Sequence, residues 1–193
     1  MTATLEPHRF SPPPSDGELL RAATTGDAAA FRHLFDRHAA AIRSYLIARL
    51  GPIAADDVLA ETFAAAWVSR ARFRVDADSA RPWLYGIATV HAKRHQAAET
   101  RWQRASHAER QVAIGERPQE EIAASCSPAL AQALSALSMK EREILLLVAL
   151  GDLTVAMAAR AVGISPVAAR MRLHRARRQV ARSLASHEGR SNA

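Results

Sequence analysis

Arginine dominates the charged residues near the end of the chain, in a pattern suited to binding a polyanion. From Thr154 to Ala193 there are eight arginines and a single acid, Glu188. A solvated helix face normally mixes both signs of charge, whereas arginine side chains match the geometry of phosphate oxygens and guanine edges. The whole chain has a net charge of +7 and a pI near 10.8, which points the same way. We therefore predict nucleic-acid binding; the alternative is a basic, solubilising tail.

Two helices that meet at a tight turn are predicted to position these arginines. Thr154 can cap a helix over residues 155–162, and Gly163 supplies the turn. Ser165 and Pro166 then fit the cap and the first turn of a last helix, which runs to about residue 185. This is the helix-turn-helix geometry, in which the second helix lies in the major groove with its early residues near base edges.

The last helix is predicted to have one packing face and one free face. Apolar residues recur every three or four positions and form the packing face, which comprises Ala169, Leu173, Ala176 and Val180. The opposite side collects Val167, Met171, His174, Arg175, Arg178 and Arg182, with Arg170, Arg172 and Arg177 on the flanks.

The rest of the sequence also predicts helices. Hydrophobic residues make up 49% of the chain, enough to fill a core, whereas aromatic residues make up only 5%. No long stretch alternates apolar and polar residues, which disfavours sheets. We predict an all-α fold with two small domains, an N-terminal helical bundle and a C-terminal helix-turn-helix domain, joined by a flexible acidic linker. The predicted parts are a disordered tail (1–15), the N-terminal domain (16–106), the linker (107–128), the C-terminal domain (129–186) and a short tail (187–193).

Caps and breaks divide the N-terminal domain into four predicted helices. Asp16 and Asp27 can each cap a helix, and a third helix is predicted to begin near Asp56. Residues 72–78 are polar and predict a loop. Pro82 then fits the first turn of a fourth helix, where its missing N–H costs nothing.

Several stretches of the chain, in order, resemble one family. "LSMKEREILLLVALGDLT", "AVGIS" and "RMRLHRARRQVARSL" are similar to the C-terminal promoter-binding domain of sigma factors. "LLRAATTGDAAAFRHLFDRH", "DDVLAETFAAAW" and "RPWLYGIATVHAKRH" resemble their N-terminal domain. The chain is identified as a member of the small, two-domain extracytoplasmic-function (ECF) group of bacterial sigma factors.

The resemblance implies a promoter-specificity subunit of RNA polymerase, which is not itself an enzyme and needs no cofactor. Its implied partners are core polymerase (the β′ coiled coil and the β subunit), promoter DNA and an anti-sigma factor. The implied contacts to the −35 element are Arg170, Met171, Arg172, His174, Arg175 and Arg178. Those to the −10 element are Arg72, Arg74, Arg81, His91, Lys93 and Arg94. Those to polymerase are Asp57, Leu59, Glu61 and Phe63, with Phe63 and Trp67 as core residues in the alternative reading.

The sequence departs from the family's usual pattern at the helix implied to contact the −10 element. Members commonly carry Arg-Asn after "IA", whereas this chain has Thr89 and Val90. Asparagine offers a donor and an acceptor to a base edge, and valine offers neither. Either His91 and the preceding loop contact the base, or promoter melting is less efficient or differently specified.

Other functional classes fit the sequence less well. His91 and His95 are one helical turn apart, but they lie in a basic stretch that would repel a metal ion, and no H-E-x-x-H motif occurs. The sequence has neither a glycine-rich phosphate loop nor a nucleophile elbow, so we predict no catalytic and no metal-binding residues. Two alternatives remain. One is a stand-alone regulator that binds DNA through its helix-turn-helix and whose N-terminal bundle dimerises or senses a ligand. The other is an interaction protein whose bundle binds an antagonist and whose basic helix is merely a solvated face.

Cysteine usage and hydropathy indicate the compartment. The single cysteine, Cys126, excludes internal disulfides and cysteine-based zinc sites, and it is either an incidental thiol or a redox handle. No apolar run is long enough to span a membrane, and the N-terminus lacks the pattern of a secretory signal. We expect a cytoplasmic protein with no membrane insertion.

Overall fold

The computed structural model describes residues 13–73, 79–109 and 127–191, and within them the protein is all-α and contains no strand. This confirms the predicted fold class. Most of the predicted N-terminal tail and most of the acidic linker lie outside the described residues. None of the helices in the described part of the chain combines the length and hydropathy needed to cross a membrane.

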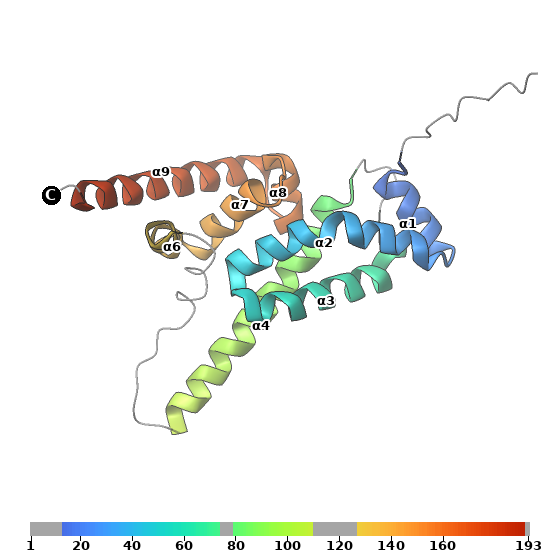
Figure 1. Ribbon diagram of the computed structural model, residues 1–193, viewed down its shortest axis with the longest axis horizontal. Helices are drawn as coiled ribbons and strands as arrows, with labels where there is room; N and C mark the ends of the chain where they lie inside the picture. Colours follow the sequence, from blue (N-terminus) through green and yellow to red (C-terminus); the bar gives the residue numbers. More distant parts are fainter. Residues whose placement is uncertain (1–12, 74–78, 110–126, 192–193) are drawn as a thin grey trace, which may run out of the picture.

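The N-terminal domain is a bundle of four α-helices, followed by a C-terminal domain in which the long last helix lies across three shorter ones (Figure 1). The bundle comprises α1 (Asp16–Thr24), α2 (Ala28–Leu50), α3 (Pro52–Ser69) and α4 (Arg81–Glu109), with a 3₁₀ turn at Arg70–Arg72. The C-terminal domain comprises α6 (Pro128–Ser135), α7 (Met139–Ala149), α8 (Val155–Val162) and α9 (Pro166–Ser191).

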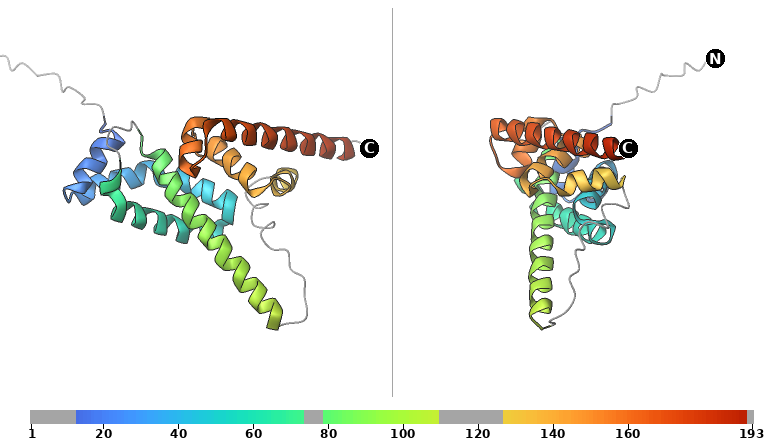
Figure 2. Two further views of the ribbon diagram at one scale, coloured as in Figure 1. Left: turned by 180° about the vertical axis from the view of Figure 1, so that it is seen from behind. Right: turned by 90° about the vertical axis from the view of Figure 1, so that its left-hand side faces the viewer.

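Helix α2 is the centre of the bundle because its buried face is mostly apolar, with His38 and Arg49 as polar residues on the same face. Leu34, Ile42, Tyr45 and Leu46 recur at helical spacing and are completely buried. They pack against α1, α3 and α4. The far half of α4 extends beyond the bundle, as both views in Figure 2 show.

Several helix boundaries differ from those that the sequence predicts. Ser15, not Asp16, caps α1, through a reciprocal capping box with Glu18. Helix α3 begins at Pro52 rather than near Asp56, because Gly51 adopts a positive φ of 88° that ends α2 and turns the chain directly into the next helix. Helix α9 continues to Ser191, beyond its predicted end near residue 185, and α4 continues to Glu109.

The caps of the helix-turn-helix match the predicted pattern. The Thr154 hydroxyl accepts a hydrogen bond from the Met157 amide, and the Ser165 hydroxyl accepts one from the Ala168 amide. The turn between α8 and α9 has Gly163 in the left-handed region at φ 69°. These caps fix the angle at which α9 leaves α8, and thus the face that α9 presents to solvent.

We predict that Gly163→Ala destabilises the protein by about 1 kcal/mol, the order of cost of a β-carbon in the left-handed region. No other atom lies within 4 Å of the added carbon, so backbone strain alone sets the loss. Thermal unfolding checks it. Gly163→Asn is the matched control and should lose less, because asparagine tolerates this conformation. An alanine variant as stable as the wild type would contradict the prediction.

The two domains pack against each other and share a continuous apolar core. Helix α8 lies on α4, and α7 lies on α2. The contact is close because two glycines face the opposite domain. A β-carbon at Gly86 would lie 3.2 Å from the Ala161 carbonyl oxygen, and one at Gly151 would lie 3.0 Å from the Tyr85 ring. We call this arrangement the closed form.

Candidate nucleic-acid interface

Helix α9 presents the predicted cationic face to solvent. Its packing face is as predicted, because Ala169, Leu173 and Ala176 are buried against the other helices of the domain. Five of the six residues assigned to the −35 element are exposed on the other side: Arg170, Met171, His174, Arg175 and Arg178. The sixth, Arg172, is half-buried. The exposed arginines lie on a rigid helix, an arrangement suited to docking on a duplex.

The residues assigned to the −10 element lie on α4 and the turn before it. Arg72 is exposed at the end of the 3₁₀ turn, and Arg74 lies outside the described residues. Arg81 begins α4 and donates a hydrogen bond of 2.8 Å to Asp152 of the C-terminal domain. Three further side chains follow along α4: His91, Lys93 and Arg94. The closed form therefore already engages part of this surface.

The residues assigned to polymerase binding lie along α3. Asp57 and Glu61 are exposed and one helical turn apart, and Leu59 is half-buried. Phe63, which the sequence predicts as an apolar anchor, is only 5% exposed, so it belongs to the core. Its ring packs edge-on against Phe31 and Phe35, at centroid distances of 6.3 and 4.7 Å.

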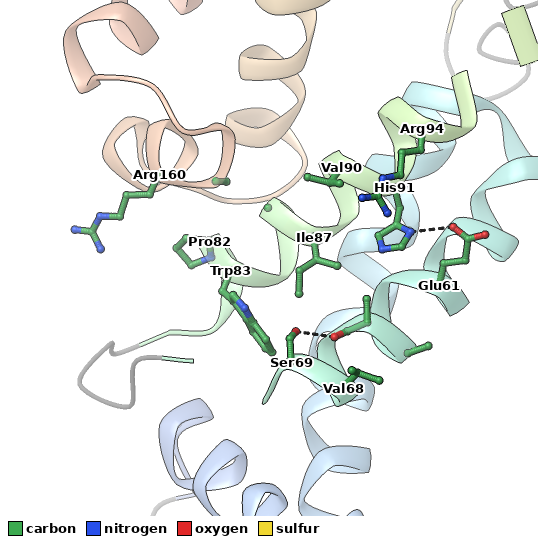
Figure 3. A pocket seen from close by; sticks show the side chains of 14 residues that line it. Glu61, Val68, Ser69, Pro82, Trp83, Ile87, Val90, His91, Arg94 and Arg160 are labelled. Carbon is green, nitrogen blue, oxygen red and sulfur yellow. Dashed lines mark hydrogen bonds and ion pairs between the residues drawn. The ribbon is translucent and has the colours of Figure 1, made fainter. Parts of the chain in front are cut away.

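A groove of about 770 Å³ joins the two predicted surfaces (Figure 3). Apolar side chains of α3 and α4 form most of it, among them Val68, Ile87 and Val90. Glu61 and His91 face each other across it at 2.9 Å. Arg160 and Ala161 of α8 form its remaining wall, which is in place only while the domains are closed.

A buried polar network between the domains was missed by sequence reasoning. Glu143 of α7 accepts a hydrogen bond of 2.9 Å from Arg49 of α2 and lies 3.2 Å from the Lys93 ammonium. Arg49 also donates to the Tyr45 hydroxyl at 2.6 Å, and that hydroxyl lies 3.0 Å from the hydroxyl of Thr89. Thr89, one of the two unusual residues on α4, is therefore turned into this network and away from solvent.

The sequence does carry a signal for this network. Glu143 lies four residues before Leu147, and Arg49 lies four residues after Tyr45, so each charge falls on the buried stripe of its helix. A charge on such a stripe indicates a polar partner from elsewhere in the fold. Which partner it meets depends on how the domains pack.

A second buried network holds the start of α4 in place. The Asp16 carboxylate accepts hydrogen bonds from Arg37 at 2.7 Å and from the Ala80 amide at 2.8 Å, and it lies 2.9 Å from His38 Nε2. Burial tends to raise the pKa of Asp16, but these partners outweigh it and hold the pKa well below its ordinary value. Asp16 thus ties α1, α2 and the segment leading into α4 together.

No group of three side chains that could hold a metal ion occurs among the described residues. His91, which the sequence pairs with His95, instead faces Glu61. What these residues form instead is a set of charged surfaces on α3, α4 and α9 that are suited to contacts with macromolecules.

Comparison with known proteins identifies both domains. Residues 34–102 match the family model for sigma-70 region 2, and residues 127–180 match that for sigma-70 region 4. Together the two matches cover more than half of the chain. No curated protein sequence matches it.

Solved structures of sigma factors share the fold. CnrH, in complex with the cytosolic domain of CnrY, is 26% identical; the match covers 89% of this chain and 97% of that one, with a TM-score of 0.67. The sigma factor RpoE from Bartonella quintana, in complex with the anti-sigma factor NepR, is 18% identical; the match covers 80% and 96% of the two chains, with a TM-score of 0.61. With both regions present in order and the same fold over nearly its whole length, this chain belongs to the ECF group of the sigma-70 family.

Proposed function

We propose that this sigma factor binds core RNA polymerase and directs it to promoters by contacting the −35 and −10 elements. One observation carries the proposal. An arginine face without acids is exposed on the second helix of a helix-turn-helix, in the same chain as a region 2 bundle. A stand-alone regulator would need only the first of these two features. We assign no catalytic group to this chain, because the chemistry of transcription belongs to the polymerase. We propose a cytoplasmic location, because that is where the polymerase works.

The proposed contact to the −35 element is made by α9. Arg170 and Arg175 are exposed on the early half of the helix, the part that enters the major groove in this geometry. An arginine can bind guanine O6 and N7 with two hydrogen bonds. We assign base contacts to Arg170, Met171, His174 and Arg175, and phosphate contacts to Arg172 and Arg178.

The proposed contact to the −10 element is made by α4 and the turn before it. Single strands bind where cations follow the backbone and polar side chains reach the bases. We assign phosphate contacts to the cations Arg72, Arg74, Arg81, Lys93 and Arg94. Because Thr89 is buried and Val90 is apolar, we assign base contact to His91.

The proposed contact to polymerase is made by α3, with Asp57 and Glu61 facing cationic side chains of the β′ coiled coil. We predict that Asp57→Lys weakens binding to core polymerase at least about tenfold, because a like charge in an interface costs several kcal/mol. Surface plasmon resonance with purified core enzyme measures this affinity.

Glu99→Lys is the matched control for the polymerase contact, because it makes the same charge reversal at an exposed site on the far half of α4. It should leave core binding unchanged. Unchanged binding of Asp57→Lys would remove the acidic contact from the proposal.

We further propose that an anti-sigma factor holds the free chain. CnrH and the Bartonella protein were both solved with such a partner or its domain. In this chain, the groove lined by α3, α4 and α8 takes its walls from both domains. A partner seated there would hold the domains closed and cover Glu61.

The decisive test is run-off transcription with purified core polymerase on a genomic promoter library. We expect the chain to direct transcription from discrete start sites and to bind promoter duplexes only weakly by itself. Tight binding to a palindromic duplex without polymerase, and no transcription with it, would instead establish a stand-alone regulator.

A further inference from the structure

The contact between the domains buries a charge cluster beside its apolar core. Arg49 and Glu143, at its centre, have side chains only 5% and 6% exposed. A buried ion pair adds little net stability compared with apolar residues of the same shape. Such a pair gives a permanent domain contact no advantage in stability. In a contact that opens, it leaves charged and readily hydrated side chains on both separated surfaces. The chemistry of the cluster therefore indicates that the two domains also exist apart from each other.

The contact also leaves a polar atom without a partner. Tyr85 Oη is buried and has no hydrogen-bond partner among the described residues. A buried hydroxyl without a partner costs free energy because it has lost its hydrogen bonds to water. The Tyr85 ring faces Gly151 of the other domain, so separation of the domains would return this hydroxyl to water, which lowers the cost of opening.

The two domains contribute different charges to the cluster. The N-terminal domain contributes the cations Arg49 and Lys93, and the C-terminal domain contributes the carboxylate of Glu143 and the Arg142 guanidinium, which donates to the Arg49 carbonyl oxygen at 3.4 Å. Among the described residues, neither cation pairs with an acid of its own domain. Opening therefore leaves a guanidinium and an ammonium side by side, in the geometry that binds one anionic oxygen.

The place of these cations indicates which anion they bind. Lys93 lies on α4, between His91 and Arg94 of the proposed −10 surface, and its side chain is half exposed. Arg49 extends that surface toward α2. A phosphodiester has the charge and the oxygen geometry that Glu143 provides in the closed form.

We propose that Arg49 and Lys93 form a phosphate-binding site for promoter DNA, which Glu143 occupies in the closed form and vacates when the domains separate. The inference rests on the proposed function and adds Arg49 to the DNA surface. The Glu143 carboxylate would therefore reduce DNA binding by the free protein, because it competes with DNA for the same two cations.

The test measures binding of the full chain to a fluorescein-labelled, mixed-sequence single-stranded oligonucleotide by fluorescence anisotropy. Glu143→Gln keeps the shape of the side chain and removes its charge. We expect it to bind at least about fivefold more tightly, because apparent affinity scales with the fraction of molecules whose site is free. Its dependence on salt should steepen by about 0.7, the slope for one additional phosphate contact on a single strand. Small-angle scattering should show a larger radius of gyration.

Two further variants distinguish binding at Arg49 and Lys93 from the nonspecific effect of removing one negative charge. Glu141→Gln removes the same charge two residues away on α7, outside the cluster, and should change affinity little. Arg49→Gln in the Glu143→Gln background should abolish the gain. Circular dichroism checks that each variant is folded.

An independent variant opens the domains without touching the charges. The Gly86→Leu side chain would meet the backbone of α8 at Ala161, so it should separate the domains and raise DNA affinity as Glu143→Gln does. It replaces Glu143→Gln as the test if that variant fails to fold.

Four results would overturn the inference: an open variant with unchanged DNA affinity, an equal gain from Glu141→Gln, a gain that survives Arg49→Gln, or a gain in affinity for core polymerase alone. The last would mean that the site binds an acidic protein surface. Run-off transcription by the wild type distinguishes a failure of this inference from a failure of the proposed function. If the wild type directs transcription and any of these four results is found, the inference is refuted and the proposed function stands.

Discussion

We expect Arg175→Ala to lower transcription from the promoters that this sigma factor recognises by roughly ten- to a hundredfold and to leave binding to core polymerase unchanged. The side chain is exposed on the free face of α9, one turn beyond Met171. A two-hydrogen-bond contact to guanine contributes about 1–3 kcal/mol of discrimination, which sets the size of the loss. Run-off transcription at fixed core concentration measures it.

Arg177 provides the control for Arg175. It is exposed on the flank of the same helix and has the same charge, so Arg177→Ala should weaken binding slightly and equally for all sequences. Arg175→Ala should instead relax specificity at one base pair of the −35 element. If Arg175→Ala reduces core binding, or if both variants lose the same activity, the base contact assigned to Arg175 is wrong.

Asp16→Asn is expected to destabilise the protein by about 3 kcal/mol, the order of loss when one partner of a buried ion pair is removed. The carboxylate is buried among Arg37, His38 and the Ala80 amide, and the amide side chain cannot satisfy all three. Urea unfolding followed by circular dichroism gives the free energy of unfolding. Loss of the hydrogen bond from the Ala80 amide should also weaken the attachment of the start of α4 to α1.

The pH dependence of stability provides a second readout at Asp16. Its folded pKa lies well below the ordinary value of 3.8, so the unfolded state binds a proton more readily. The stabilisation by Asp16 is therefore fully present well above pH 3.8 and is lost as the pH falls below that value. Between about pH 5 and pH 3, roughly one unit on either side of the ordinary pKa, the free energy of unfolding should fall more steeply for the wild type than for Asp16→Asn.

Asp56 is the matched control for burial. It makes hydrogen bonds of 2.6 and 3.0 Å to Arg43, so its geometry is as good as that of Asp16. Both side chains of that pair are largely exposed, and exposed pairs contribute little. Asp56→Asn should leave stability nearly unchanged. An equal loss for both variants would show that burial does not set the effect.

Local patterns in the sequence were sufficient for much of the fold. The spacing of apolar residues predicts α9, and the predicted caps at Asp27 and Thr154 lie where their side chains can reach a free amide a few residues on. Such signals act over one or two helical turns, so a single sequence carries them completely. The start of α1 was misplaced because Ser15 and Asp16 are both possible caps, and that of α3 because the helix begins after Gly51 without a side-chain cap.

The sequence by itself thus determined the helices, the order of the two domains and the arginine face of α9, because each depends on residues within a few turns of one another. Only the tertiary structure decided that Glu143 meets Arg49, 94 residues earlier in the chain, and that Asp16 meets the Ala80 amide, 64 residues later. It also decided that Phe63 is core and that Thr89 faces inward. The physical reason is that a buried charge needs a partner but does not specify which one, and that choice is made by how whole helices pack.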